Sequence, residues 1–327
     1  MERRDSQIIK GIAILMMLFL HLFNRMNNVE LCQPWVWIGG EPLVYILRQA
    51  FNPVSFFLIV GGYGLYKSYE KGDRNRYSRV FKLYVHYWII FLIFVGIGCF
   101  IKPDVFPCGL FDFLSNITCY HNTINHEMWF MLPYVGLSLL APIIFRFYSR
   151  FNFLTILLVT LALYSILTQV ILSNLKWFYA HYWVYNPTLV LHLLYFFSLG
   201  ALAARAHIFE RLRRWVDKRV QARGEESAVR RRLLAGVLAW SAIIALIIIN
   251  CHWEYNYFYA FGIISCILVA PMPEIVKGTL ALLGKHSMNM WMIHSWWCYY
   301  LFRDFTYSFR YPLIIFLMLV AISLICS

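Results

Sequence analysis

The sequence predicts an all-α, polytopic integral membrane protein with about ten transmembrane helices. Of its 327 residues, 61% are hydrophobic and 14% are charged, whereas an ordinary soluble domain is about 25% charged. Apolar runs of about 20 residues, the length that crosses a bilayer as a helix, recur along the whole chain. Basic residues gather on alternate connecting segments, which is typical of a multi-pass protein of the cell membrane.

We predict ten membrane-spanning segments within a single domain that covers residues 1–327. Their approximate bounds are 8–24, 43–66, 81–101, 127–145, 153–172, 186–204, 233–250, 257–273, 288–302 and 311–326. No small-residue cleavage site follows the first segment, so we expect a membrane helix there rather than a cleaved signal peptide. Gly61, Gly62 and Gly64 in the second segment are expected to let a neighbouring helix approach closely.

The distribution of the net charge of +13 predicts the orientation of these segments. With the N-terminus inside, the inner segments hold 23 of the 29 Lys and Arg residues and the outer loops hold five. This asymmetry predicts that both termini are cytoplasmic. Ten of the basic residues lie in the cytoplasmic segment 205–232, which is either an interfacial amphipathic helix or a solvated loop that sets topology. Such a surface suits anionic membrane lipids and an anionic cytosolic substrate, and not nucleic acid.

His21 is the first candidate for chemistry, because it lies deep in an apolar segment that Lys10 opens. Eleven residues at a rise of ~1.5 Å each place the imidazole roughly 16 Å into a hydrocarbon core of ~30 Å. An ionisable side chain at that depth is costly and indicates a functional site. The ordinary pKa of histidine suits a general base. The alternative is a structural histidine that hydrogen-bonds to a neighbouring helix.

His294 is the second candidate, nine residues after Lys285 in a segment that also runs outward. The same helical rise places it roughly 13 Å from the inner boundary. We therefore expect His21 and His294 to lie at similar depth. Taken alone, His294 is equally well explained as a satisfied core residue.

A group of polar and aromatic residues is expected at the outer mouth. Glu127 opens the fourth segment beside His126 and Trp129, and Arg48 lies about one and a half turns into the second segment from outside. We expect Arg48 and Glu127 to pair or to flank a wet cavity, because an unpaired charge there would be costly. Glu127 could also orient an acceptor, or it could simply be an acidic residue in a first turn, where the helix dipole favours negative charge. Trp129 suits either an interfacial belt or stacking on a sugar ring.

A basic ridge precedes and opens the third segment. Arg76, Arg79 and Lys82 follow one another at three-residue spacing, so they share one face of a helix. Guanidinium groups on a cytosolic ridge suit phosphate recognition. The alternative, for these residues and for Lys10, is the positive-inside rule alone.

The eight cysteines form no CxxC or other metal-ligand pattern, and no metal is expected. Cys108 and Cys119 share one outer loop and could form a disulfide in an oxidising compartment. Their pairing cannot be deduced from the sequence and stays open.

Five motifs in this order resemble the membrane acyltransferase 3 family. They are KGIAILMMLFLH from Lys10 to His21, PVSFFLIVGGY from Pro53 to Tyr63, the pair Arg76 and Arg79, MWFMLPYVGLSLLAPI, and LGKHSMNMWMIH from Leu283 to His294. The resemblance runs across most of the chain. Its departures leave both histidines in place: Gly61 replaces the usual Ser, Trp291 stands where Tyr is common, and Lys82 falls near a usual Pro.

The resemblance implies a membrane O-acyltransferase that modifies cell-surface carbohydrate. In this family an acyl-CoA donor, usually acetyl-CoA, binds from the cytosol, and the acyl group reaches an acceptor hydroxyl on the outer side. The expected partners are therefore acyl-CoA, membrane lipids and an extracytoplasmic polysaccharide or glycoside, with O-acetylation as the expected reaction.

The resemblance also implies roles for the candidate residues. Arg76 and Arg79 would hold donor phosphates at an entrance that Lys10 and Lys82 assist. His21 would deprotonate the acceptor hydroxyl or carry the acyl group transiently, and the sequence does not choose between these routes.

Three further residues complete this implied site. Glu127 would orient His21 or the acceptor, and His126 would join Glu127 at the outer mouth. His294 would polarise the thioester or complete the pocket.

Two other classes of protein fit the composition. An exporter of carbohydrate or lipid with a proton-relay histidine would also need buried ionisable groups, although no inverted repeat is evident. A non-enzymatic scaffold would explain the topology but not two histidines at matched depth. Detectable binding of acyl-CoA would discriminate an acyltransferase from both. The sequence does not specify the acceptor, the length of the acyl chain or the oligomeric state.

Overall fold

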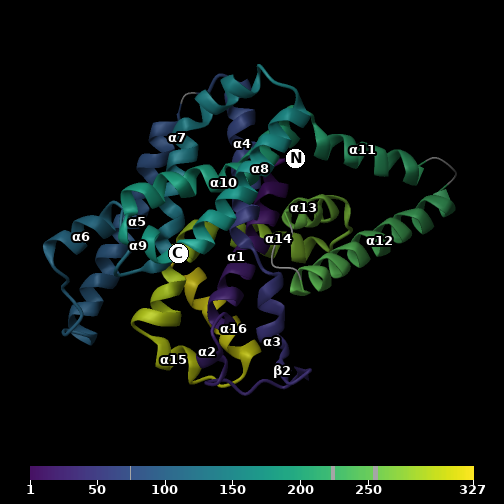
Figure 1. The fold of residues 1–327 in the computed structure, drawn as a ribbon. Coiled ribbons are helices and arrows are strands. Elements are labelled where there is room, and N and C mark those ends of the chain that lie inside the picture. The colour runs from purple at the N-terminus through teal and green to yellow at the C-terminus, as the bar shows by residue number, and fades with distance from the viewer. Residues whose placement is uncertain (74, 222–224, 253–256) are drawn as a thin grey trace. The chain divides into compact units, whose positions relative to one another are not determined.

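The computed structural model describes residues 1–73, 75–221, 225–252 and 257–327 (Figure 1). Within these ranges the chain is helical apart from two strands of two residues, β1 (Trp37–Ile38) and β2 (Glu41–Pro42), which pair antiparallel. The predicted all-α class is therefore confirmed.

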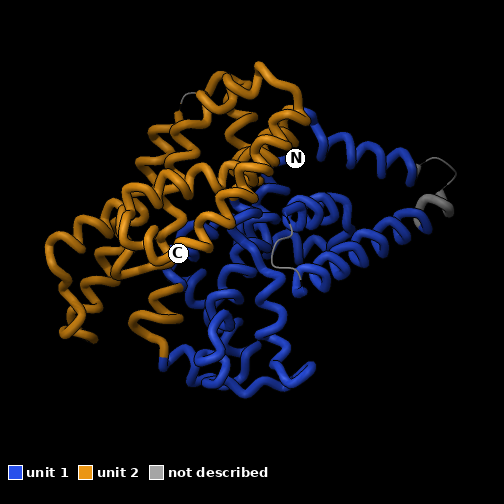
Figure 2. Tube along the Cα trace, viewed as in Figure 1, with its two compact units in different colours: residues 1–57, 206–294, 304–327 blue, residues 58–205, 295–303 orange. Residues whose placement is uncertain are grey.

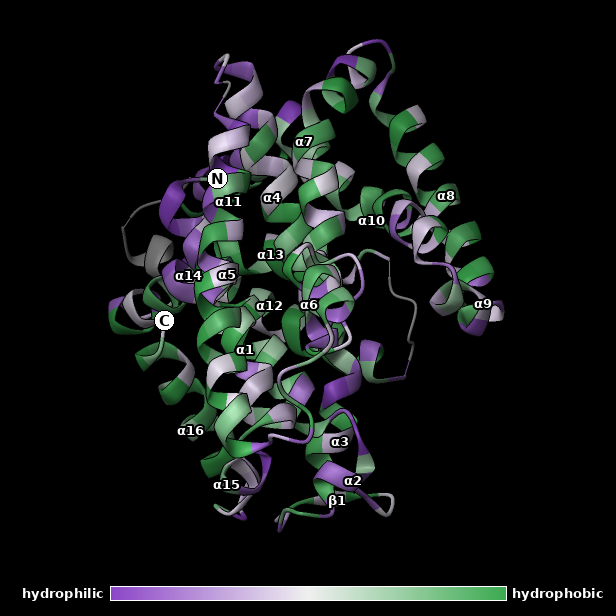
Figure 3. Ribbon diagram, turned by 90° about the vertical axis from the view of Figure 1, so that its left-hand side faces the viewer, coloured by the Kyte–Doolittle hydropathy of each residue, from purple (hydrophilic) through white to green (hydrophobic). Residues whose placement is uncertain are grey.

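Seven helical stretches of the described residues are long and apolar enough to cross a membrane. They are α1 (Arg3–Phe23), Leu43–Glu70, α5 (Arg76–Ile101), His126–Tyr148, α8 (Phe153–Ser173), α10 (Tyr182–Arg205) and Arg230–His252 within α12 (Glu225–His252). Two shorter apolar helices, α13 (Tyr259–Val269) and α16 (Pro312–Ile325), follow. Hydrophobic residues dominate helices such as α7 and α16 (Figure 3). These helices support the predicted polytopic membrane protein.

The other elements are shorter or more polar. They are α2 (Met26–Val29), α3 (Leu43–Leu47), the 3₁₀ turn η1 (Arg48–Ala50), α4 (Pro53–Glu70), α6 (Leu110–Ile117), the 3₁₀ helix η2 (His126–Phe130), α7 (Met131–Tyr148), α9 (Leu175–Ala180), α11 (Ile208–Gln221), α14 (Glu274–Ser295), the π-helical turn η3 (Trp296–Tyr300) and α15 (Arg303–Tyr307).

Two predicted segments differ most from the structure in their bounds. The segment 43–66 is interrupted, because the helix ends in η1 and resumes only at Pro53. Proline disfavours the helical conformation of the residue before it and lacks an N–H. The segment 288–302 belongs to a helix that begins fourteen residues earlier, at Glu274. Lys277 lies near the start of α14 and Lys285 near its middle, and both lower its mean hydropathy. A search for apolar segments therefore does not find the start of this helix, which packing stabilises.

The basic segment 205–232 forms helix rather than loop over its described residues. In α11, Phe209 is buried, and Leu212, Val216 and Val220 are partly buried. Exposed charged residues occupy most of the rest of that helix, namely Arg211, Arg214, Asp217, Lys218 and Arg219, together with the exposed Trp215. The amphipathic-helix alternative is therefore the one that the structure supports. Arg223, one of the ten basic residues, lies outside the described residues.

The chain divides into two compact units, each assembled from separate stretches (Figure 2). Unit 1 contains residues 1–57, 206–294 and 304–327, and unit 2 contains residues 58–205 and 295–303. In unit 1, α1 packs on α13 and α16, and α12 packs on α13. In unit 2, α10 packs on α7 and α8, where the rings of Phe145 and Phe197 stack with centroids 5.7 Å apart. Each unit thus has its own apolar core.

Each unit also contains a crossing where two helix backbones touch. In unit 1, a Cβ on Gly11 would lie 2.0 Å from the Leu280 carbonyl oxygen, and one on Gly284 would lie 1.8 Å from the Gln7 carbonyl oxygen. Only glycine fits at such distances. The two glycines therefore determine how closely α1 and α14 approach.

The corresponding crossing in unit 2 joins α4 to α10. A Cβ on Gly62 would lie 2.0 Å from the Phe197 carbonyl oxygen, and one on Gly200 would lie 1.9 Å from that of Ile59. The prediction of close approach is thus confirmed for Gly62. The position of Gly61 would make only an ordinary contact, and that of Gly64 meets nothing within 4 Å.

Candidate active site

His21 and His294 lie next to each other in unit 1. Their ring centroids are 4.9 Å apart, with the rings tilted by 49°. His21 is in the last turn of α1 and His294 in the last turn of α14. Each histidine lies ten residues after the glycine of its helix at the α1–α14 crossing, Gly11 or Gly284. Two parallel helices in this register bring the histidines to the same level, as their matched depth predicts.

The hydrogen bond of His294 defines which of its ring nitrogens carries the proton in the neutral ring. The residue is completely buried, and its Nδ1 lies 2.6 Å from the carbonyl oxygen of Trp291. A carbonyl only accepts hydrogen bonds, so Nδ1 carries the proton. In the neutral ring the lone pair is then on Nε2, where it can accept a proton or a hydrogen bond. His21 is half-buried, so it is the more accessible imidazole of the pair.

Two residues that sequence reasoning missed make hydrogen bonds on these helices, Tyr307 at the end of α1 and Ser287 within α14. The buried hydroxyl of Tyr307 donates to the carbonyl oxygen of Leu22 at 2.8 Å, next to His21. The last carbonyls of a helix lack partners within it, so this bond fixes the end of α1. Ser287, also buried, donates to the Gly284 carbonyl at 2.9 Å and steadies α14 at the crossing. No signal in the sequence singles out Tyr307, whereas Ser287 belongs to the last quoted motif.

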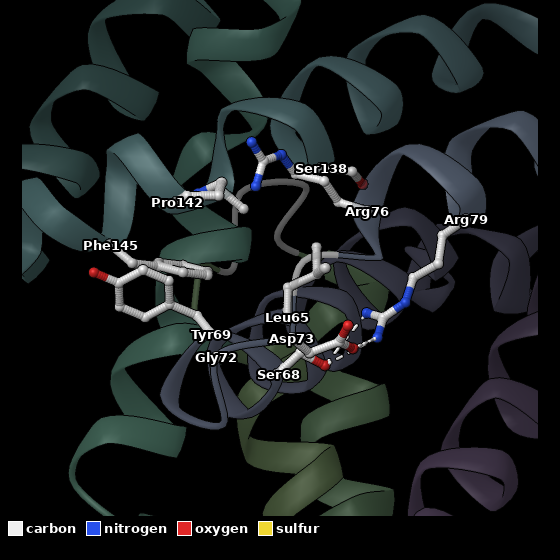
Figure 4. A pocket seen from close by; sticks show the side chains of 11 residues that line it. Leu65, Ser68, Tyr69, Gly72, Asp73, Arg76, Arg79, Ser138, Pro142 and Phe145 are labelled. Carbon is white, nitrogen blue, oxygen red and sulfur yellow. Dashed lines mark hydrogen bonds and ion pairs between the residues drawn. The ribbon is translucent and has the colours of Figure 1, made fainter.

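Arg76 and Arg79 line one cavity in unit 2 of about 250 Å³. The close-up in Figure 4 shows both guanidinium groups at its edge. Side chains from α4, α5, α7 and the loop between α4 and α5 form its wall: Leu65, Ser68, Tyr69, Gly72, Asp73, Arg76, Arg79, Ser138, Ala141, Pro142 and Phe145. The cavity thus combines an apolar floor with two cations. Lys82 is exposed on α5 and does not line it.

The two arginines differ in how they are held. Arg79 forms an ion pair with Asp73 and hydrogen bonds of 3.2 and 3.3 Å with the Ser68 hydroxyl (Figure 4). Arg76 lies over the ring of Tyr77 at 4.6 Å and donates to its hydroxyl at 3.2 Å. Its buried Nε has no hydrogen-bond partner among the described residues. Arg76 therefore keeps an N–H donor that is not used within the protein, whereas Asp73 already neutralises Arg79.

Two residues of the predicted outer mouth, His126 and Glu127, follow Asn125 in unit 2. Its side-chain oxygen accepts from the Glu127 backbone N–H at 3.2 Å and from the Ser295 hydroxyl at 3.1 Å. The His126 N–H donates to the hydroxyl of Tyr300 at 2.9 Å. Asn125 and Ser295 are almost completely buried and were not singled out by the sequence. These bonds fix the start of η2, which leaves His126 exposed and Glu127 half-buried.

Two further candidates, Trp129 and Arg48, both contact aromatic or apolar side chains. Trp129 packs against the apolar cluster of Ile171, Phe178 and Leu189 in unit 2, which is a packing role. The guanidinium of Arg48 lies 4.0 Å from the centre of the Tyr45 ring in unit 1.

Several predicted partnerships join residues of different units. Lys10, His21, Arg48 and His294 belong to unit 1, whereas Arg76, Arg79, Lys82, His126, Glu127 and Trp129 belong to unit 2. The expected contacts of Glu127 with Arg48 and with His21 stay predictions for this reason. Cys108 and Cys119, whose pairing the sequence leaves open, are both free thiols.

The fold and these side chains define a class: a polytopic membrane protein with a histidine pair in one unit and a cationic cavity in the other. The family model described as an acyltransferase domain matches residues 4–327, nearly the whole chain. The protein therefore belongs to the acyltransferase 3 family and is a membrane acyltransferase, as the motifs predict. No curated protein and no solved structure matches the chain.

Proposed function

We propose that this acyltransferase moves an acyl group, most simply acetyl, from cytosolic acyl-CoA to a hydroxyl of an extracytoplasmic polysaccharide or glycoside. The observation that carries the proposal is the contact between His21 and His294, two imidazoles with centroids 4.9 Å apart. One packed helix pair can hold them because glycines at its crossing let the backbones touch. Paired imidazoles in the last turns of two packed helices suit proton transfer at a membrane-embedded site.

The acid–base step is assigned to the histidine pair. In the direct route, the His21 imidazole takes the acceptor hydroxyl proton while the oxygen attacks the thioester carbonyl. The carbon–sulfur bond breaks, and the thiolate of CoA takes up a proton. In the two-step route, a ring nitrogen of His21 first accepts the acyl group and then passes it to the hydroxyl. His294, whose Nδ1 proton is directed to Trp291, is assigned to assist His21 in either route.

The donor is assigned to the cavity of Arg76 and Arg79. Phosphate oxygens of CoA accept from guanidinium groups in strong, charge-assisted hydrogen bonds. Arg76 has donors to spare, and Arg79 is held in position by Asp73. Lys10 and Lys82 add positive charge on the predicted cytoplasmic side. At the outer side, His126, Glu127, Arg48 and Trp129 are assigned to the acceptor, with Glu127 orienting it or His21.

The test is acyl transfer by the purified, reconstituted protein with acetyl-CoA and a soluble glycoside. We expect His21→Ala to lower kcat by about 10²- to 10⁴-fold, the range for removal of a general base. The matched control is His252→Ala in the same unit, because His252 is exposed and its Nδ1 bonds to the Ile248 carbonyl of its own helix. Full transfer by His21→Ala would refute the assignment.

A further inference from the structure

Unit 2 contains a second cavity, on the other side of α7 from the arginine cavity. It measures about 370 Å³ and is lined by Ile143, Ile144, Phe147, Tyr148, Phe151, Thr155, Ile156, Val159, Thr160, Leu163 and Leu194. These residues come from the end of α7, the connection after it (Phe151), the first half of α8 and the middle of α10. We call it the α7–α8 groove. It shares no residue with the cavity of Arg76 and Arg79.

The lining of the α7–α8 groove is hydrocarbon. The two buried polar side chains in it are turned to protein partners: the Thr160 hydroxyl donates to the Ile156 carbonyl at 2.8 Å, and the Tyr148 hydroxyl bonds to that of Ser198. Exposed apolar residues form its rim, with Ile143 68% and Val159 61% exposed. A polar ligand would find no partner there and would lose its own hydration.

Basic residues lie at one end of the groove, where α7 ends and α8 begins. Arg146, in the last turn of α7, and Arg150, two residues beyond that helix, are both exposed. Arg205 at the end of α10 donates to the carbonyl oxygens of Tyr148 at 2.8 Å and Phe151 at 3.1 Å. It thereby satisfies carbonyls at the end of α7 and holds the connection to α8. Arg146 and Arg150 are exposed and therefore accessible to a ligand at this end of the groove.

We propose that the α7–α8 groove binds one acyl chain of an anionic glycerophospholipid whose phosphate lies at Arg146 and Arg150. From Thr155 to Leu163 the groove follows α8 for eight residues, roughly 12 Å, close to the ~15 Å of one leaflet in a ~30 Å hydrocarbon core. Its charged end is on the predicted cytoplasmic side, where anionic lipids concentrate. Hydrocarbon lining and charge complementarity thus select a phospholipid of that leaflet.

Native mass spectrometry of the full chain tests the groove. The protein is released from micelles that contain phosphatidylglycerol and phosphatidylcholine in equal amounts. We expect the wild type to retain phosphatidylglycerol preferentially. Val159→Trp and, independently, Ile143→Trp should abolish this retention, because the indole fills the groove from an exposed position. Leu158→Trp is the matched control: Leu158 is 53% exposed on the same helix but does not line the groove.

The headgroup is tested by Arg146→Gln and Arg150→Gln. Each should reduce retention of phosphatidylglycerol about fivefold, which corresponds to the ~1 kcal/mol of one basic residue near an anionic surface. Retention of phosphatidylcholine should not change. Equal retention of both lipids by the wild type, or full retention by both Trp variants, would overturn the proposal. The readout is bound lipid, so the outcome is independent of the assignments for acyl transfer.

Discussion

The histidine pair of unit 1 and the arginine cavity of unit 2 are built in opposite ways. The histidines end two helices whose backbones touch at Gly11 and Gly284, and His294 is completely buried. The arginine cavity depends on a loop, and Arg79 is held there by Asp73. A packed crossing positions side chains rigidly, whereas a solvated ion pair can exchange its partner for another anion. The first arrangement suits chemistry and the second suits binding and release.

After His21→Ala, the largest effect should come from removing the second histidine. We expect His294→Ala to lower kcat about 100-fold with little change in donor KM, because it leaves the arginine cavity intact. If the histidines act as a unit, the variant with both replaced by Ala should be little worse than His21→Ala alone. Steady-state kinetics of the three variants check this. Multiplicative losses would show that the two rings act separately.

The next effect concerns the crossing that holds the pair. Gly284→Ala should destabilise the protein by about 1–3 kcal/mol, because the added Cβ meets the Gln7 backbone. Gly278→Ala on the same helix meets nothing within 4 Å and should stabilise by about 1 kcal/mol through helix propensity. Thermal unfolding in detergent measures both. Equal shifts of the same sign would mean that α1 and α14 do not touch as described.

Replacing an arginine of the cavity should change the affinity for the acyl donor rather than kcat. Arg76→Ala should raise the donor KM about 10- to 100-fold, the value of hydrogen bonds to a charged group, with kcat nearly unchanged. Arg79→Ala should have a smaller effect, since Asp73 already occupies that guanidinium. Lys176→Ala, exposed on α9 in unit 2 and outside the cavity, is the control. A larger effect at Arg79 than at Arg76 would reverse the division of roles.

The smallest effect is expected at the ion pair that joins the first turns of α1 and α14. Arg4 donates to Glu274 at 2.5 Å, and this hydrogen bond lowers the pKa of the Glu274 carboxyl. A lowered pKa in the folded state stabilises the protein above the pKa of the unfolded state, and this gain is lost as pH falls through the folded-state pKa. Arg4→Gln should therefore lower Tm slightly at pH 7 and not under acid conditions. A pH-independent shift would contradict this, and a shift as large as that of Gly284→Ala would mean that charge rather than close packing joins the helices.

Much of the fold follows from local properties of the sequence, and the exceptions are instructive. The apolar segments correspond closely to the observed helices because hydrophobic length is a local property. The break before Pro53 has a local cause that hydropathy does not register. The early start of α14 at Glu274 depends on packing against α1, which no property of residues 274–287 reveals.

Of the candidate site, the sequence by itself determined the residue types, the helical spacing of Arg76 and Arg79, and the family, which its motifs indicate and the match over residues 4–327 confirms. Only the tertiary structure decided that His21 lies beside His294, 273 residues away in the chain, and that Asp73 pairs with Arg79. The physical reason is that hydropathy and periodicity depend on near neighbours. Contacts depend instead on which helices can approach, and here that requires a missing Cβ on both partners at the α1–α14 crossing.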